Sequence, residues 1–100
     1  MPKTLTPPTS DTPVNELWNL SELTASWLID DGINTYGDLR KSDLVEVWLS
    51  LKKQHKQVTR LIYYALWGAV NDCHWNKIPE KEKDKLKKLQ VILKKLEKLV

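Results

Sequence analysis

Several residue types are scarce or missing in this chain, and each absence excludes a class of protein. The 100 residues contain no phenylalanine, three glycines and a single cysteine, Cys73. One thiol cannot form an internal disulfide and is typical of a reducing compartment. No apolar run approaches the roughly 18–20 residues of a membrane span, and the first ten residues lack the apolar core of a signal peptide. We therefore expect a cytoplasmic protein with no membrane contact.

Residues that could carry chemistry are equally scarce. The only histidines are His55 and His74. His74 follows Cys73 directly, and neighbouring residues on a helix do not share a face, so packing or helix-end roles are favoured over a metal site or a nucleophile–base pair. The three glycines are too scattered for a phosphate-binding loop. We expect no enzyme, no cofactor and no small-molecule substrate.

The remaining composition is that of one folded domain. Apolar residues make up 41% of the chain and charged residues 29%, which is ordinary for a globular protein. Residues 1–14 hold four of the five prolines and four threonines, and this composition predicts a flexible arm. Residues 15–100 are the predicted domain.

Capping signals divide that domain into helices. Ser21, Thr35 and Thr59 are N-cap residue types that precede apolar segments, and either Ser42 or Asp43 can cap another. Thr35 with Asp38 resembles a capping box. Helices are thus expected at about 22–31, 36–41, 43–55 and 60–72, with a last one after the proline at position 79. The absence of alternating apolar runs predicts no sheet.

The apolar residues predict how these helices pack. Leu23, Trp27 and Leu28 suggest one buried face on the first helix, and Trp48 is expected in the core. Gly68 lies in the middle of the 60–72 helix, where glycine costs about 1 kcal/mol relative to alanine. We expect another backbone to approach closely at that position.

The last helix is both basic and apolar. From residue 77 onward nine lysines oppose four acids, a net charge of +5, whereas residues 1–76 carry −2. This asymmetry favours an anionic partner, or it marks a solvated helix face. Leucines and a valine also recur at intervals of three and four residues, which predicts an apolar seam. The seam residues are Leu86, Leu89, Leu93, Leu96 and Val100.

Two segments resemble the C-terminal domain of the TfoX/Sxy family. The first, LWNLSELTASWLIDDGINTYGDLR, matches the family at positions that include Asn19, Gly32 and Ile33. The second, LIYYALWGAVNDCHWNKIPEKEKDKL, matches its Ala-Leu-x-Gly-Ala run around Gly68 and a His-Trp pair at His74. The resemblance spans residues 15–90. It implies an all-α, compact five-helix domain related to helix-hairpin-helix folds, ending here in a long basic amphipathic helix.

The resemblance also implies a pathway. TfoX/Sxy proteins regulate DNA uptake (natural competence) together with the cyclic-AMP receptor protein, and their helical domain follows an α/β domain. We therefore expect this chain to be either a stand-alone version of the helical domain or a fragment. The chain departs from the family at two places. Ser21-Glu22 stands where relatives have Gly-Pro in the hairpin, so a carboxylate replaces part of a phosphate-contacting surface. Trp67 stands where relatives often have Glu. Both departures favour a protein contact over DNA.

Two functions from different classes follow. The first is a non-enzymatic module that binds a protein partner or a second copy of itself, in which an exposed tryptophan would anchor the interface, although Trp67 also suits the core. Its expected residues are Trp67, Leu93, Leu96 and Val100. The alternative is non-specific nucleic-acid binding, which salt would weaken steeply. Its expected residues are Lys52, Lys53, Arg60, Lys87, Lys88, Lys94 and Lys95.

Overall fold

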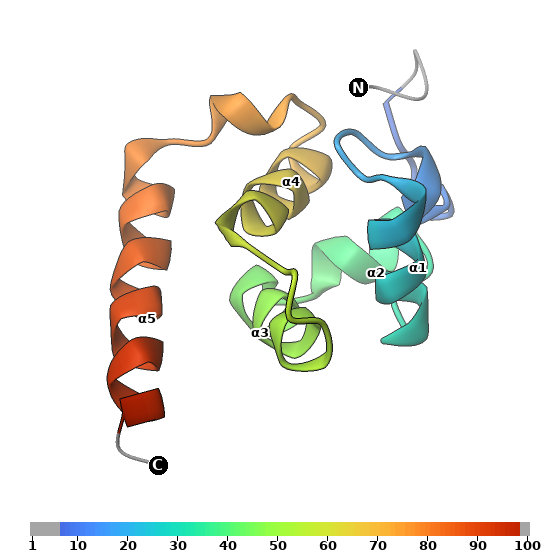
Figure 1. The fold of residues 1–100 in the computed structure, drawn as a ribbon. Helices are drawn as coiled ribbons and strands as arrows, with labels where there is room; N and C mark the ends of the chain where they lie inside the picture. Colours follow the sequence, from blue (N-terminus) through green and yellow to red (C-terminus); the bar gives the residue numbers. More distant parts are fainter. Residues whose placement is uncertain (1–6, 99–100) are drawn as a thin grey trace.

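The computed structural model describes residues 7–98, with side chains as far as Leu96, and it is helical over that range (Figure 1). The five α-helices are α1 (Glu22–Asp30), α2 (Tyr36–Lys41), α3 (Leu44–Gln54), α4 (Arg60–Val70) and α5 (Glu80–Lys98). The all-α class is confirmed. Residues 7–98 contain no β-strand, and their one β-bridge is an isolated pair between Pro13 and Thr35. The relation to helix-hairpin-helix folds stays a prediction.

The helices begin where the capping residues lie. Ser21 Oγ accepts a hydrogen bond from the backbone N–H of Thr24 at 3.1 Å, and Thr35 forms a complete capping box with Asp38. Of the two candidates for α3, Asp43 is the cap. Two 3₁₀ turns, η1 (Val14–Glu16) and η2 (Trp75–Lys77), were not expected from the sequence. Such one-turn elements lack the apolar periodicity that identifies longer helices.

Helix α4 is the centre of the core. Six of its residues are buried, and it packs against α2, α3 and η2. Trp48 of α3 is fully buried and donates its indole N–H to the carbonyl of Thr59 at 3.0 Å. Trp27 is buried as predicted, but Leu23 is 56% exposed. The buried face of α1 is centred between Thr24 and Leu28, which leaves Leu23 on the outer flank.

Part of the predicted arm lies on the domain. The backbone N–H of Tyr36 donates to the carbonyl of Thr12 at 2.8 Å, and that of Gly37 donates to Ser10 at 3.0 Å. Val14 is fully buried. These hydrogen bonds satisfy amides at the start of α2, where helical partners are missing. Residues 10–14 therefore cover the N-terminus of α2.

Helix α5 stands beside this body rather than within it. Figure 1 shows the chain leaving α4 through η2 and then turning so that α5 runs alongside α3 and α4. The dimensions of the molecule are 46 × 29 × 21 Å. Among the helices of residues 7–98, none has an apolar stretch long enough to cross a bilayer.

Candidate interaction surface

A contact between two loops determines where the chain goes after α4. Asn19, in the left-handed region with φ of 67°, donates its side-chain amide to the carbonyl of Cys73 at 3.0 Å. The Asn19 amide oxygen accepts a hydrogen bond from the backbone N–H of Trp75 at 3.2 Å. The two hydrogen bonds join Asn19 to residues that lie 54 and 56 positions further along the chain. This contact holds η2, and through it the start of α5, against the body.

Gly68 makes that contact possible. A Cβ at this position would lie 2.7 Å from the carbonyl oxygen of Cys73 and would also collide with the Asn19 amide. The expectation that another backbone approaches Gly68 is confirmed. Asn19, Gly68 and the His-Trp pair, which carry much of the family resemblance, meet at this one place in the fold.

The loop after α4 also gathers aromatic rings. Trp18 packs edge-on against His74 with ring centroids 6.3 Å apart, and the Trp75 ring is tilted relative to His74 with centroids 5.3 Å apart. His74 Nδ1 accepts a hydrogen bond from the backbone N–H of Asn76 at 3.2 Å and so caps η2. His74 thus has a helix-end role, and the described residues contain no group of three potential metal ligands.

Along the described part of its apolar seam, α5 is buried at Leu86 and exposed at Leu96. Leu86 is 2% exposed and belongs to the core, whereas Leu89 and Leu93 are half-buried against it. Leu96 is 52% exposed, which is more than any other seam leucine. The body therefore ends before the seam does, and Ile92, at 53% exposure, widens the uncovered strip.

One cation–π contact joins the first half of α5 to α4. Lys83 pairs with Glu80 at 3.5 Å, and its ammonium lies 5.9 Å from the centre of the Tyr64 ring. The neighbouring Tyr63 is 2% exposed. Burial, together with the Glu82 and Asp43 carboxylates, raises the pKa of Tyr63 to about 12. The Tyr63 phenol is therefore neutral at physiological pH.

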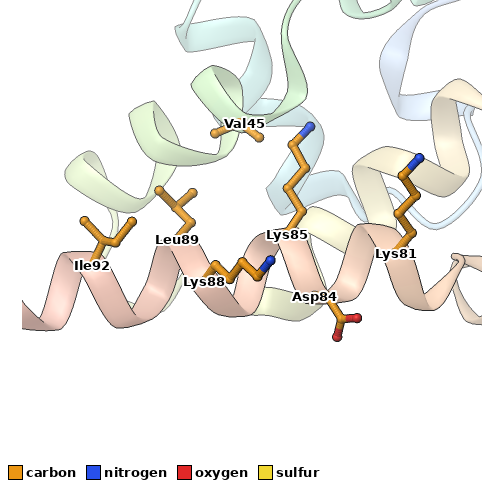
Figure 2. A pocket seen from close by; sticks show the side chains of 7 residues that line it. All are labelled: Val45, Lys81, Asp84, Lys85, Lys88, Leu89 and Ile92. Atoms are coloured by element: carbon orange, nitrogen blue, oxygen red, sulfur yellow. The ribbon is translucent and has the colours of Figure 1, made fainter.

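A groove runs between α5 and the first half of α3 (Figure 2). Its volume is about 530 Å³. Val45 contributes from α3, and the other lining residues are on α5: Lys81, Asp84, Lys85, Lys88, Leu89 and Ile92. Leu89 of the seam and the exposed Ile92 both line the groove, so its lining combines apolar side chains with ammonium groups.

The residues expected to bind nucleic acid differ in how exposed their charged groups are. Lys87, Lys88, Lys94 and Lys95 are all exposed on α5. Lys53 in the last turn of α3 and Arg60 in the first turn of α4 are also exposed. Lys52 instead donates to the carbonyl of Val58 at 3.4 Å and lies over the Trp48 ring, so its ammonium is engaged within the domain.

The residues expected at a protein interface lie in different environments. Trp67 is half-buried and packs against the core, as Leu93 does, while Leu96 is open to solvent. Val100 is outside the described residues. Sequence reasoning missed Val45, Lys81 and Lys85 of the groove. The two lysines could have been found, because their spacing of four residues, continued by Leu89, places them on one flank of α5.

Comparisons with known proteins identify relatives of this arrangement. The family model described as the TfoX C-terminal domain matches residues 10–89. A crystal structure of an uncharacterized protein from Listeria monocytogenes is similar, with a TM-score of 0.76 and 30% sequence identity. The similarity covers 83% of this chain and 94% of that one. Among curated proteins, none matches the chain.

Proposed function

Because this chain belongs to the TfoX C-terminal domain family, we propose that it is a non-enzymatic regulatory module that binds a protein partner through the uncovered end of α5. The observation that carries the proposal is the exposure of Ile92 and Leu96 on a helix whose seam begins fully buried at Leu86. Burying such side chains stabilises a complex by about 25 cal/mol for each Å² of apolar surface removed from water. We place this activity in the cytoplasm, in keeping with the free thiol of Cys73.

Affinity capture with the full chain tests this surface. The variant Ile92→Gln/Leu96→Gln removes the apolar side chains and leaves the net charge unchanged. The matched control is Leu23→Gln/Leu61→Gln, since these leucines are 56% and 53% exposed elsewhere on the domain. We expect a protein that wild type and control both retain and that the α5 variant loses. Equal capture by all three proteins would assign the partner to another surface.

The link to natural competence is supported by the family resemblance. Deleting the gene should lower the frequency of DNA transformation in a competent host, and re-expressing the wild-type chain should restore it. Complementation by the Ile92→Gln/Leu96→Gln variant should fail. An unchanged transformation frequency after deletion would remove competence from the proposal while leaving partner binding to be judged by capture.

A second candidate function is direct nucleic-acid binding, favoured by the four exposed lysines at positions 87, 88, 94 and 95 of α5. If all four contact phosphates, affinity for duplex DNA should fall about 150-fold between 50 and 200 mM salt, from a slope of about −0.9 per phosphate. A gel-shift series across that range measures the slope. No retardation at the lower salt concentration would exclude this function.

A further inference from the structure

One flank of α5 changes character along its length. Lys81, Lys85, Leu89 and Ile92 follow each other at intervals of four, four and three residues, so they lie on the same side of the helix. Figure 2 shows these four side chains projecting toward the side on which Val45 stands. The first half of the flank is therefore basic, and the second half is apolar.

Among the residues whose side chains the structure describes, the lysines of this flank have no acidic partner. In the part of the chain that the structure describes, the one ion pair joins Lys83 to Glu80, and Lys81, Lys85 and Lys88 are not in it. The only acid lining the groove, Asp84, points away from the body in Figure 2. The lining of the groove thus carries three ammonium groups and one carboxylate beside its apolar side chains.

We propose that the groove between α3 and α5 binds an acidic amphipathic helix of a partner protein. This inference rests on the proposed function and names the chemistry of the partner. Carboxylates of the partner lie opposite Lys81, Lys85 and Lys88, and its apolar side chains fill the space beside Val45 and Ile92. The flank from Lys81 to Ile92 extends about 17 Å, which accommodates about three turns of helix in a helix-in-groove arrangement.

Charge complementarity distinguishes this occupant from two others. A second copy that presented the same flank would place lysines opposite lysines in a parallel arrangement, and lysines opposite Leu89 and Ile92 in an antiparallel one. In neither arrangement does the flank supply a carboxylate for the ammonium groups, which disfavours the complex. Duplex DNA would satisfy the ammonium groups, but its phosphates would gain nothing from Val45, Leu89 and Ile92. An acidic amphipathic helix uses both halves of the flank.

Synthetic peptides test the proposal with the full chain. The probe is a fluorescently labelled peptide of about four helical turns, with leucines on one face and glutamates on both flanks. Its partner peptide has lysine in place of each glutamate. Fluorescence anisotropy should show binding of the acidic peptide and at least about tenfold weaker binding of the basic one, since like charges across an interface disfavour the complex.

Matched charge reversals locate the contact. Lys81→Glu/Lys85→Glu should weaken binding of the acidic peptide by at least about tenfold. Lys87→Glu/Lys94→Glu changes the net charge equally on another side of α5 and should have a clearly smaller effect. All four lysines are in a surface helix with partly or fully exposed side chains, and circular dichroism checks that each variant is folded. Equal losses in the two variants would overturn the proposal, because they would show general attraction only.

Four other results would also overturn it. Acidic and basic peptides could bind equally well, or neither could bind. Sedimentation equilibrium could reveal a dimer that Val45→Glu disrupts, which would place a second copy in the groove. A short DNA duplex could lose affinity in Lys81→Glu/Lys85→Glu but not in the control, which would assign the groove to nucleic acid.

The same variants separate this inference from the proposed function. If a cellular partner is lost from Ile92→Gln/Leu96→Gln but retained by Lys81→Glu/Lys85→Glu, the partner binds the end of α5 and the groove inference alone fails. If neither a partner nor the acidic peptide binds the wild-type chain, both fail. Loss of the partner from both variants, with selective binding of the acidic peptide, supports both.

Discussion

Adding one methyl group at Gly68 tests the contact that holds α5 in place. In an open helix, Gly→Ala stabilises by about 1 kcal/mol. Here the new Cβ would lie 2.7 Å from the carbonyl oxygen of Cys73 and 3.2 Å from the amide nitrogen of Trp75. Both atoms are backbone, so neither can rotate away. The Asn19 side chain would also have to move, although two hydrogen bonds hold it.

The opposing effects can be compared in size. Overpacking of this kind costs about 1–3 kcal/mol, and the two Asn19 hydrogen bonds contribute about 1 kcal/mol each. After the gain in helix propensity is subtracted, Gly68→Ala should lower the free energy of unfolding by about 2–4 kcal/mol. That is a large part of the roughly 5–15 kcal/mol of a typical domain. The melting temperature Tm should fall by about 10 °C or more.

Urea unfolding followed by tryptophan fluorescence measures this change. Gly32→Ala is the control, since Gly32 has φ of 87° but open space around its Cβ position. It should cost only about 1–2 kcal/mol, from the left-handed backbone. In an Asn19→Ala background, Gly68→Ala should cost less than in wild type, because the side chain it displaces is gone. A Gly68→Ala protein as stable as wild type would refute the crowding argument.

Three further predictions concern the helices around this contact. Leu86→Ala should cost about 2–5 kcal/mol in chemical denaturation because Leu86 is in the core, whereas Leu96→Ala should change stability by less than about 0.5 kcal/mol. The pKa of Tyr63 rises from 10.0 to about 12 on folding, so this residue's contribution is complete below pH 10 and is lost as pH rises toward 12, by up to about 1.4 kcal/mol per pH unit. Comparing Tyr63→Phe with wild type across that range isolates the effect, and identical pH profiles would contradict it. Thr35→Ala should cost about 1 kcal/mol by removing the cap of α2, and an unchanged urea midpoint would show that tertiary contacts alone hold that helix.

Helix α5 combines two roles along one element. Its first half is held by the burial of Leu86 and by the contact of Lys83 with the Tyr64 ring, and its second half exposes Ile92 and Leu96. Substitution of the buried Leu86 should therefore alter folding and binding together, whereas substitutions of exposed residues on either half of α5 should alter binding alone. This division gives the capture and peptide experiments folded variants to work with.

Much of the fold could be predicted from the sequence because its signals are local. Ser21, Thr35 and Thr59 each accept a hydrogen bond from an amide two or three residues ahead. These contacts depend only on neighbouring residues, so the helix starts are encoded where they occur. The seam of α5 and the crowding at Gly68 were likewise readable, since helical spacing and a costly mid-helix glycine both carry a physical meaning.

The tertiary structure decided which of these surfaces are covered. Periodicity placed Leu23 on a buried face, but the neighbours of α1 pack on another flank and leave it exposed. Lys52 looked available for phosphates, yet its ammonium contacts Val58 and Trp48. Asn19 reaches across more than 50 residues to hold the loop before α5. Spacing along a helix identifies residues that share a side. Whether the rest of the protein covers that side depends on the packing of segments that are distant in the sequence. For this reason only the tertiary structure shows that Lys81, Lys85 and Ile92 border an open groove.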